Sequence, residues 1–329
     1  MVQRVVLQLA ALTLILSVTG VAHAQSVLPG ASLYAVPPTP SPGTQVTITA
    51  TGFSFDRETL RFDWTINGKV LPELSGVGKY SVTVNAGAVG EDINVRARVS
   101  DGGSTVGTLA INVPIADLSL VQFAETYVPK WYKGRALPIP GSTVTIVAMP
   151  EIEIGGRLAK PENLFYSWSV DNREEVQKGV GAQTLRLALA ATGRKEYRVR
   201  VRVEDVARTI KKEGMVFIRP TTPRAVLYAH TPLGGIEYRN ALSTLVSSRR
   251  GLFDFIVEPF FFSIAAKNAL SYGWSVANEP SEGNPKNPDL LTIDVDPKSA
   301  GEAEINVTVS DPRNEFLSSA SDALRLILQ

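Results

Sequence analysis

Three copies of one pattern organise this chain, and the pattern is that of β-strands. Each copy has a tryptophan inside a short stretch whose apolar residues alternate with polar ones, and the copies lie about 105 residues apart. The three tryptophans are Trp64, Trp168 and Trp274. A second alternating stretch follows each tryptophan and ends in an aspartate 37 residues beyond it. The three aspartates are Asp101, Asp205 and Asp311. A period of two is typical of strands with one buried face.

Short alternating strands, turn residues between them and no long helical pattern favour antiparallel β-sandwiches. A unit of about 100 residues with a tryptophan on an early central strand has the size of an immunoglobulin-like sandwich. We therefore predict an all-β chain with three tandem domains, at residues 25–114, 115–220 and 221–329. The tryptophans are expected in the cores between the sheets. Asp101, Asp205 and Asp311 are expected to cap the turns that follow their strands.

The first 24 residues have the features of a cleaved signal peptide. Arg4 precedes an apolar run at residues 5–18, and Ala22-His23-Ala24 offers small residues at a cleavage site. The alternative is a membrane anchor, but the run is shorter than the ~20 residues that a spanning helix needs. No later stretch is apolar enough to span a bilayer, so we expect an exported protein, periplasmic, at the cell surface or extracellular.

Composition excludes several classes of function. Lys and Arg total 33 against 32 for Asp and Glu, which argues against a nucleic-acid binder. The absence of cysteine excludes disulfides, thiol catalysis and cysteine-ligated metals. His230 is the one histidine outside the signal peptide, too few for a histidine metal site, and no nucleophile motif accompanies it. We expect no cofactor, although calcium at the three repeat aspartates, or at Asp294 and Asp296, stays an alternative.

The tryptophan strand and the Val-x-Val-x-Asp strand together resemble the PKD family, and the resemblance covers residues 28–329 as three copies. It implies an immunoglobulin-like sandwich. The family's Gly-Asp-Gly turn after the tryptophan strand is replaced by Asn67-Gly68-Lys69 in the first copy and by other residues in the next two, which leaves other immunoglobulin-like subfamilies open. Residues 127–150 are also similar to a segment of uncharacterised exported PKD-like bacterial proteins, a similarity that implies no activity.

Two groups of residues are candidates for binding. Arg198, Arg200 and Arg202 alternate with valines, so the three arginines share one solvent face of a strand. Such a stripe could bind an anionic glycan or an acidic protein, or it could be an ordinary solvated face. The second group combines aromatic and basic side chains, which suits contact with sugar or protein, or packing at the junction of the first two domains. Its members are Trp131, Tyr132, Lys133 and Arg135.

These observations predict a non-catalytic exported protein that binds or builds structure at the cell envelope, through protein–protein or adhesive contacts. A carbohydrate-binding protein for envelope or environmental polysaccharide is the first alternative, and a glycoside hydrolase with a carboxylate pair is the second. Charge is uneven, with net +5 over residues 115–220 and net −4 over residues 221–329. Self-association is therefore a further expectation, in addition to an envelope protein or polysaccharide as partner.

Overall fold

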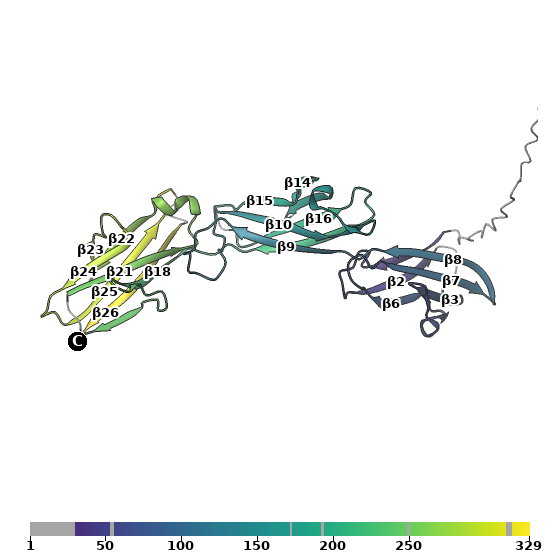
Figure 1. Ribbon diagram of the computed structural model, residues 1–329, viewed down its shortest axis with the longest axis horizontal. Helices are drawn as coiled ribbons and strands as arrows, with labels where there is room; N and C mark the ends of the chain where they lie inside the picture. Colours follow the sequence, from purple (N-terminus) through teal and green to yellow (C-terminus); the bar gives the residue numbers. More distant parts are fainter. Residues whose placement is uncertain (1–29, 53–55, 172, 192–193, 249–250, 314–317) are drawn as a thin grey trace, which may run out of the picture. The chain divides into compact units, whose positions relative to one another are not determined.

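The computed structural model describes residues 30–52, 56–171, 173–191, 194–248, 251–313 and 318–329 (Figure 1). The predicted signal peptide lies outside the described residues. The regular secondary structure of the described chain is almost entirely β-strand, in sheets whose pairs are antiparallel with one exception, and its helical elements are short 3-10 turns. The predicted all-β class of antiparallel sandwiches is therefore confirmed.

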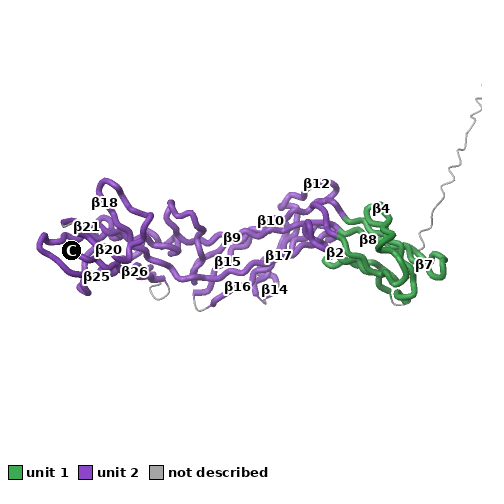
Figure 2. The backbone as a smooth tube through the Cα atoms, turned by 90° about the horizontal axis from the view of Figure 1, so that it is seen from below, with its two compact units in different colours: residues 1–38, 46–84, 93–113 green, residues 39–45, 85–92, 114–329 purple. Residues whose placement is uncertain are grey.

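The chain divides into two compact units, coloured separately in Figure 2. The smaller unit comprises residues 1–38, 46–84 and 93–113, and the larger one residues 39–45, 85–92 and 114–329. The larger unit thus holds the strands of both the second and the third repeat. The domain boundaries at 115 and 221 stay predictions.

The first repeat forms two sheets, in the strand orders β1-β2-β6 and β4-β3-β7-β8, with β5 paired to β3. The strands are β1 Ala31–Val36, β2 Gln45–Gly52, β3 Arg61–Ile66, β4 Lys69–Val70, β5 Gly76–Val77, β6 Ser81–Asn85, β7 Ile93–Asp101 and β8 Ser104–Val113, and the 3-10 turn η1 is Pro72–Leu74. Inward positions alternate with exposed ones along β7, as the sequence period requires.

The second repeat forms sheets in the orders β15-β10-β9 and β14-β13-β16-β17, with a small hairpin β11-β12. The strands are β9 Asp117–Ala124, β10 Thr143–Glu151, β11 Glu153–Ile154, β12 Arg157–Leu158, β13 Phe165–Val170, β14 Arg173–Val180, β15 Thr184–Ala188, β16 Tyr197–Glu204 and β17 Lys211–Ile218, and the turn η2 is Pro161–Asn163. In chain order these strands place A, B and E in one sheet and C, F and G in the other, which is an immunoglobulin-like arrangement.

The third repeat forms sheets in the orders β19-β18-β21-β24 and β20-β26-β25-β22-β23. The strands are β18 Arg224–Thr231, β19 Gly235–Ile236, β20 Thr244–Ser247, β21 Gly251–Phe260, β22 Ser271–Val276, β23 Glu279–Ser281, β24 Leu290–Val295, β25 Gly301–Ser310 and β26 Ser319–Leu328, and the turn η3 is Ile264–Ala269. The short strand β20 runs parallel to β26 and covers an edge of the second sheet.

The three tryptophans occupy equivalent places in the cores. Trp64 and Trp168 have no exposed surface, and Trp274 retains 4%. Each indole N–H donates to the backbone carbonyl of a residue 14 or 15 positions further along the chain. The acceptors are Lys79 at 2.7 Å, Ala182 at 2.7 Å and Pro288 at 2.9 Å. Because the single polar atom of each ring is satisfied, burial of the large ring carries no hydrogen-bond penalty.

The repeat aspartates differ in what they do. The Asp205 carboxylate accepts the backbone N–H of Ile210 at 2.7 Å and the hydroxyl of Thr209 at 2.9 Å. The Asp311 carboxylate accepts the backbone N–H of Arg313 and two guanidinium donors of the same residue, Nε–H and Nη2–H. Both carboxylates are thus occupied by their own turns. The Asp101 side chain is exposed, and its hairpin instead relies on the positive φ angles of the two glycines that follow it.

Candidate functional site

The arginines of the second repeat share one exposed face of a sheet. Strand β16 lies between β13 and β17. Its valines are buried in the core, and the arginines that alternate with them are exposed. The three arginines are Arg198, Arg200 and Arg202. The strand period therefore places three guanidinium groups side by side on the outer surface.

Strand β17 adds apolar side chains to the same face. Phe217 lies opposite Arg198, and Met215 lies opposite Arg200. Phe217 is 37% exposed and Met215 is 51% exposed. The guanidinium carbon of Arg198 lies 5.8 Å from the centre of the Phe217 ring, within the range of a cation–π contact. We call Arg198, Arg200, Arg202, Met215 and Phe217 the arginine face.

One end of the arginine face is neutralised and the rest is not. Arg202 donates to the carboxylate of Glu213 at 3.0 Å, and Lys211 lies 3.1 Å from the same carboxylate. Burial opposes ionisation of Glu213, but these hydrogen bonds hold its pKa below the usual value. Among the described residues, no ion pair engages Arg198 or Arg200. Two cations beside two exposed apolar groups are typical of the centres of binding surfaces.

Trp131 packs against the third repeat. Its ring stacks on Tyr238, with centroids 4.2 Å apart and an interplanar angle of 29°. It meets Tyr228 and Phe260 edge to face at 5.7 Å and 5.9 Å, and Tyr132 also meets Phe260 edge to face. Of the alternatives for Trp131, packing at the junction of the first two domains is wrong, because the partners of its ring belong to the third repeat. The segment between β9 and β10 reaches that repeat directly.

Lys133 and Arg135 are exposed in the same segment. Arg135 lines a pocket of about 140 Å³ together with Phe217, which belongs to the arginine face, and Arg219, which follows it on the chain. The structure thus places Arg135 close to one end of the arginine face, whereas the Trp131 side chain packs in an aromatic cluster with the third repeat. Trp131 and Arg135 were grouped because they lie close together in the sequence. Sequence spacing does not reveal that their side chains contact different repeats.

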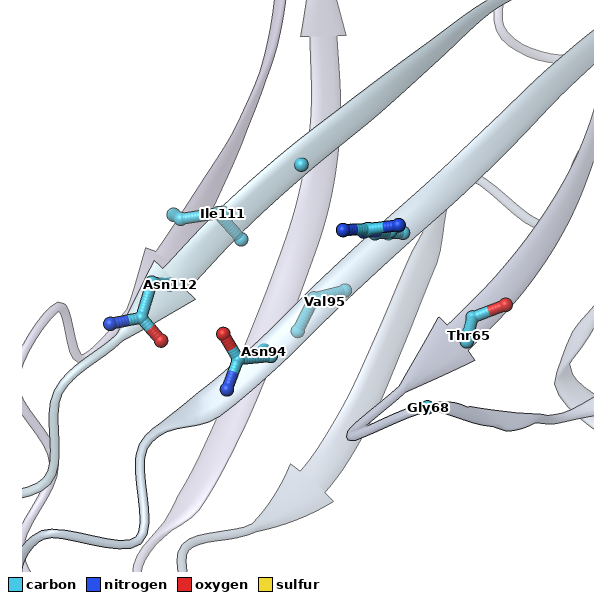
Figure 3. Close-up of a pocket in the computed structure, with 8 residues that line it drawn as sticks. Thr65, Gly68, Asn94, Val95, Ile111 and Asn112 are labelled. Atoms are coloured by element: carbon cyan, nitrogen blue, oxygen red, sulfur yellow. The ribbon is translucent and has the colours of Figure 1, made fainter. Parts of the chain in front are cut away.

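The first repeat carries a depression on the equivalent face of its sheet. Its volume is about 540 Å³, and it is lined by side chains of β3, β7 and β8 (Figure 3). Asn94 and Asn112 are register partners on β7 and β8. Asn94 and Arg96 precede Arg198 and Arg200 by one repeat, 104 residues. Neither residue is among the candidates predicted from the sequence, although an alignment of the repeats position by position pairs them with the arginines.

The remaining candidates show no assembled reaction site. His230 Nδ1 lies 3.5 Å from Asp254 Oδ2, and the Thr292 hydroxyl donates to Asp254 Oδ1 at 2.7 Å. These are cross-strand neighbours on one sheet. Over the described ranges, no group of three or more potential metal-ligating side chains occurs. Asp294 and Asp296 line a depression of about 340 Å³ in the third repeat, whose lining mixes apolar side chains with these carboxylates and that of Glu302.

Comparisons with known proteins do not place the chain in a family. No protein-family model matches it, and no curated protein matches it. One similar solved structure is the three N-terminal domains of the bacteriophage RB49 Highly Immunogenic Outer Capsid protein, at 12% identity and TM-score 0.27, covering 91% of this chain and 98% of that one. Another is a structure of Clostridium thermocellum CbhA fibronectin(III)-like modules, at 12% identity and TM-score 0.23, covering 64% and 94%. A third, Sidekick-1 immunoglobulin domains 1–4, has 14% identity and TM-score 0.21, covering 91% and 74%.

With TM-scores of 0.27 or less, these similarities carry no argument, and the immunoglobulin-like assignment rests on the strand order itself. Within the described residues, no helix is long and apolar enough to cross a membrane.

Proposed function

We propose that this chain is an exported, non-catalytic protein that binds an anionic component of the cell envelope through the arginine face of its second repeat. The observation that carries the proposal is the pairing of Arg198 and Arg200, which have no ion pair in the described chain, with the exposed side chains of Met215 and Phe217. Guanidinium groups bind carboxylates and phosphates with two parallel hydrogen bonds. The apolar neighbours would give the contact an area that excludes water.

The interactions of three carboxylates support a non-catalytic role. The carboxylates of Asp205 and Asp311 are bound by their own turns, and Glu213 is held by two cations. Groups occupied in this way stabilise local structure and are poorly placed to exchange protons with a substrate. Export is proposed from the N-terminal sequence, and membership of the PKD-like exported proteins from the repeat pattern.

The test is retention of residues 25–329 on isolated envelope of the producing organism. The double variant Arg198→Gln/Arg200→Gln is expected to lose at least ten-fold in retention, because each charge-assisted hydrogen bond contributes about 1.5–3 kcal/mol. The matched control is Arg157→Gln/Arg224→Gln, which removes the same charge from exposed arginines outside the face.

Envelope treated with polysaccharide-degrading enzymes or with protease identifies the partner. Loss after glycan digestion indicates a polysaccharide, and loss after proteolysis indicates a protein. Equal retention of the double variant and its control would refute the proposal. Retention by the wild-type chain should also fall as salt is raised from 50 to 500 mM, because exposed charges are screened within about 10 Å at 0.1 M.

A further inference from the structure

A small pocket lies where the sheet edges of β9 and β17 meet the segment before β10. It holds about 140 Å³ and is lined by Gln122, Arg135, Pro138, Val144, Phe217 and Arg219, among others. Phe217 belongs to the arginine face, so the pocket continues that face at one end. A cavity of this size is well below the ~300–1,000 Å³ typical of sites for whole drug-sized ligands. It can accept a single small ring, or one unit of a polymer that lies across the face.

Gln122 lines the pocket, and its side chain carries an unsatisfied acceptor. Its side-chain oxygen is buried, and no donor reaches it among the residues that the structure describes. Leaving such a group unpaired costs about 1–3 kcal/mol, so the oxygen is poised for a donor brought by a ligand. The residue comes from the face of β9 whose Leu118 and Leu120 pack on the core, which accounts for its burial.

Two cations line the same pocket. Arg135 is exposed, and no ion pair holds it in the described chain. Arg219 donates to Glu196 at 2.7 Å, and its guanidinium carbon lies 5.9 Å from the Phe217 ring centre. A guanidinium has five N–H donors, so Arg219 can keep Glu196 and still bind a second anion. Val144 and Phe217 add an apolar wall.

We propose that this pocket binds one carboxylated sugar unit of an acidic polysaccharide. A hexuronate has the complementary groups on one ring: a carboxylate for Arg135 and Arg219, hydroxyl donors for the Gln122 oxygen, and C–H groups for the apolar wall. An aspartate or glutamate side chain of a protein carries only acceptors at neutral pH, so it would leave Gln122 unpaired. The inference rests on the proposed function and specifies which anion the face binds.

The probe is trigalacturonate, titrated calorimetrically into residues 25–329, with neutral trigalactose and a tri-glutamate peptide as comparisons. Wild-type protein is expected to bind trigalacturonate and to bind both comparison ligands at least ten-fold more weakly. Gln122→Met keeps the length of the side chain and removes the acceptor, and it should weaken binding about five-fold. Arg135→Gln should weaken it about ten-fold, and the control Arg157→Gln should leave it unchanged.

Thermal unfolding separates a ligand contact from a structural role. If the Gln122 oxygen serves to bind a ligand, Gln122→Met will leave the melting temperature of the free protein unchanged or raise it, because an unpaired buried oxygen is removed. Loss of affinity together with a lower melting temperature would instead assign Gln122 to the fold and overturn the inference. Equal affinity for Gln122→Met, or equal binding of trigalactose or of the glutamate peptide, would overturn it too.

The two proposals can fail separately. Retention on envelope that depends on Arg198 and Arg200, with no binding of trigalacturonate, would refute the pocket and leave the arginine face standing. Envelope retention that does not depend on Arg198 and Arg200, together with no binding of trigalacturonate, would refute both proposals.

Discussion

The carboxylate of Asp171 accepts the backbone N–H of Arg198 at 2.9 Å, while the Asp171 N–H donates to the Arg198 carbonyl at 2.7 Å. These two bonds join the turn after the tryptophan strand to the start of the strand that bears the arginines. In the first repeat Asn67 makes the same two bonds with Asn94, both at 2.8 Å. In the third repeat Ala277 keeps only the backbone bond, to Glu304 at 2.8 Å. The relationship spans 27 residues in every repeat.

Replacing Asp171 with alanine should destabilise the second repeat. The substitution leaves the Arg198 N–H without its acceptor and puts alanine at a φ of 57°, where residues other than glycine, asparagine and aspartate are disfavoured. We expect a loss of about 1–3 kcal/mol in the free energy of unfolding, measured in urea by the fluorescence of Trp168 in a chain whose other tryptophans are replaced by phenylalanine.

Asp171→Asn is the control for this experiment. It keeps an acceptor and a residue that tolerates positive φ, and removes only the charge that pairs with Arg194. Since the Arg194 side chain is 42% exposed and its charge is screened by solvent, the control should lie within about 1 kcal/mol of wild type. Equal destabilisation by Ala and Asn would show that the charge, and not the hydrogen bond, holds the turn.

An asparagine at position 277 should stabilise the third repeat, which lacks the side-chain hydrogen bond that Asn67 and Asp171 make in the other two. Ala277 has a φ of 51°, and asparagine tolerates this conformation better than alanine does. Its side chain could also accept the Glu304 N–H, as Asn67 accepts that of Asn94. Ala277→Asn is therefore expected to raise the free energy of unfolding by about 1 kcal/mol. The Trp274 fluorescence in urea reports it, and a decrease would contradict the equivalence of the three turns.

Truncating Trp131 should loosen its site on the third repeat. Trp131→Ala removes three aromatic contacts, each contributing about 0.5–1.5 kcal/mol beyond burial, so amide hydrogens near Tyr228, Tyr238 and Phe260 should exchange at least ten-fold faster. Trp131→Phe keeps an aromatic ring and should show a smaller change. Unaltered exchange in the alanine variant would mean that the cluster contributes little in solution.

Glu258 should make the third repeat less stable as pH rises. Burial raises the pKa of its carboxyl above the usual 4.5, the nearby Asp289 adds to the shift, and Tyr238 and Lys267 oppose it. A carboxyl whose folded pKa is raised stabilises the fold below its unfolded pKa, and this contribution is lost as pH rises through the folded value.

Glu258→Gln tests this sign, because glutamine can still accept the Tyr238 hydroxyl that now donates to Glu258 at 3.2 Å. The variant should melt at a higher temperature than wild type at pH 7, and the advantage should shrink towards pH 4. If the variant melts at a lower temperature than wild type at pH 7, the ionised Glu258 carboxylate stabilises the folded state, and the expected sign is wrong.

Much of the fold followed from the repeat pattern. Alternation around Trp64, Trp168 and Trp274 is enough to define the buried face of each central strand, because successive side chains of a strand point to opposite sides. The turn role of Asp205 was likewise expected, and the structure gives it two donors. The reliance of the first hairpin on Gly102 and Gly103, with the Asp101 side chain exposed, was not expected. A type I′ turn depends on φ angles that the glycines supply.

The candidate site was only partly predictable. Arg198 and Arg200 were found because their alternation with valine is local. Gln122 and Phe217 were not, because they lie on other strands and meet Arg135 only after the sheets have paired. Trp131 was grouped with Arg135 by sequence proximity, yet its ring packs on Tyr238, more than 100 residues further along the chain.

The sequence by itself determined that this chain builds repeated β-sandwiches, because a period of two and turn residues act over a few neighbouring positions. It also determined that no cysteine chemistry supports the fold. The tertiary structure alone decided which exposed cations stay unpaired, which aromatic ring is buried and where a buried acceptor lacks a donor. These properties depend on strand pairing and packing between residues far apart in the chain, and local sequence patterns do not specify such contacts.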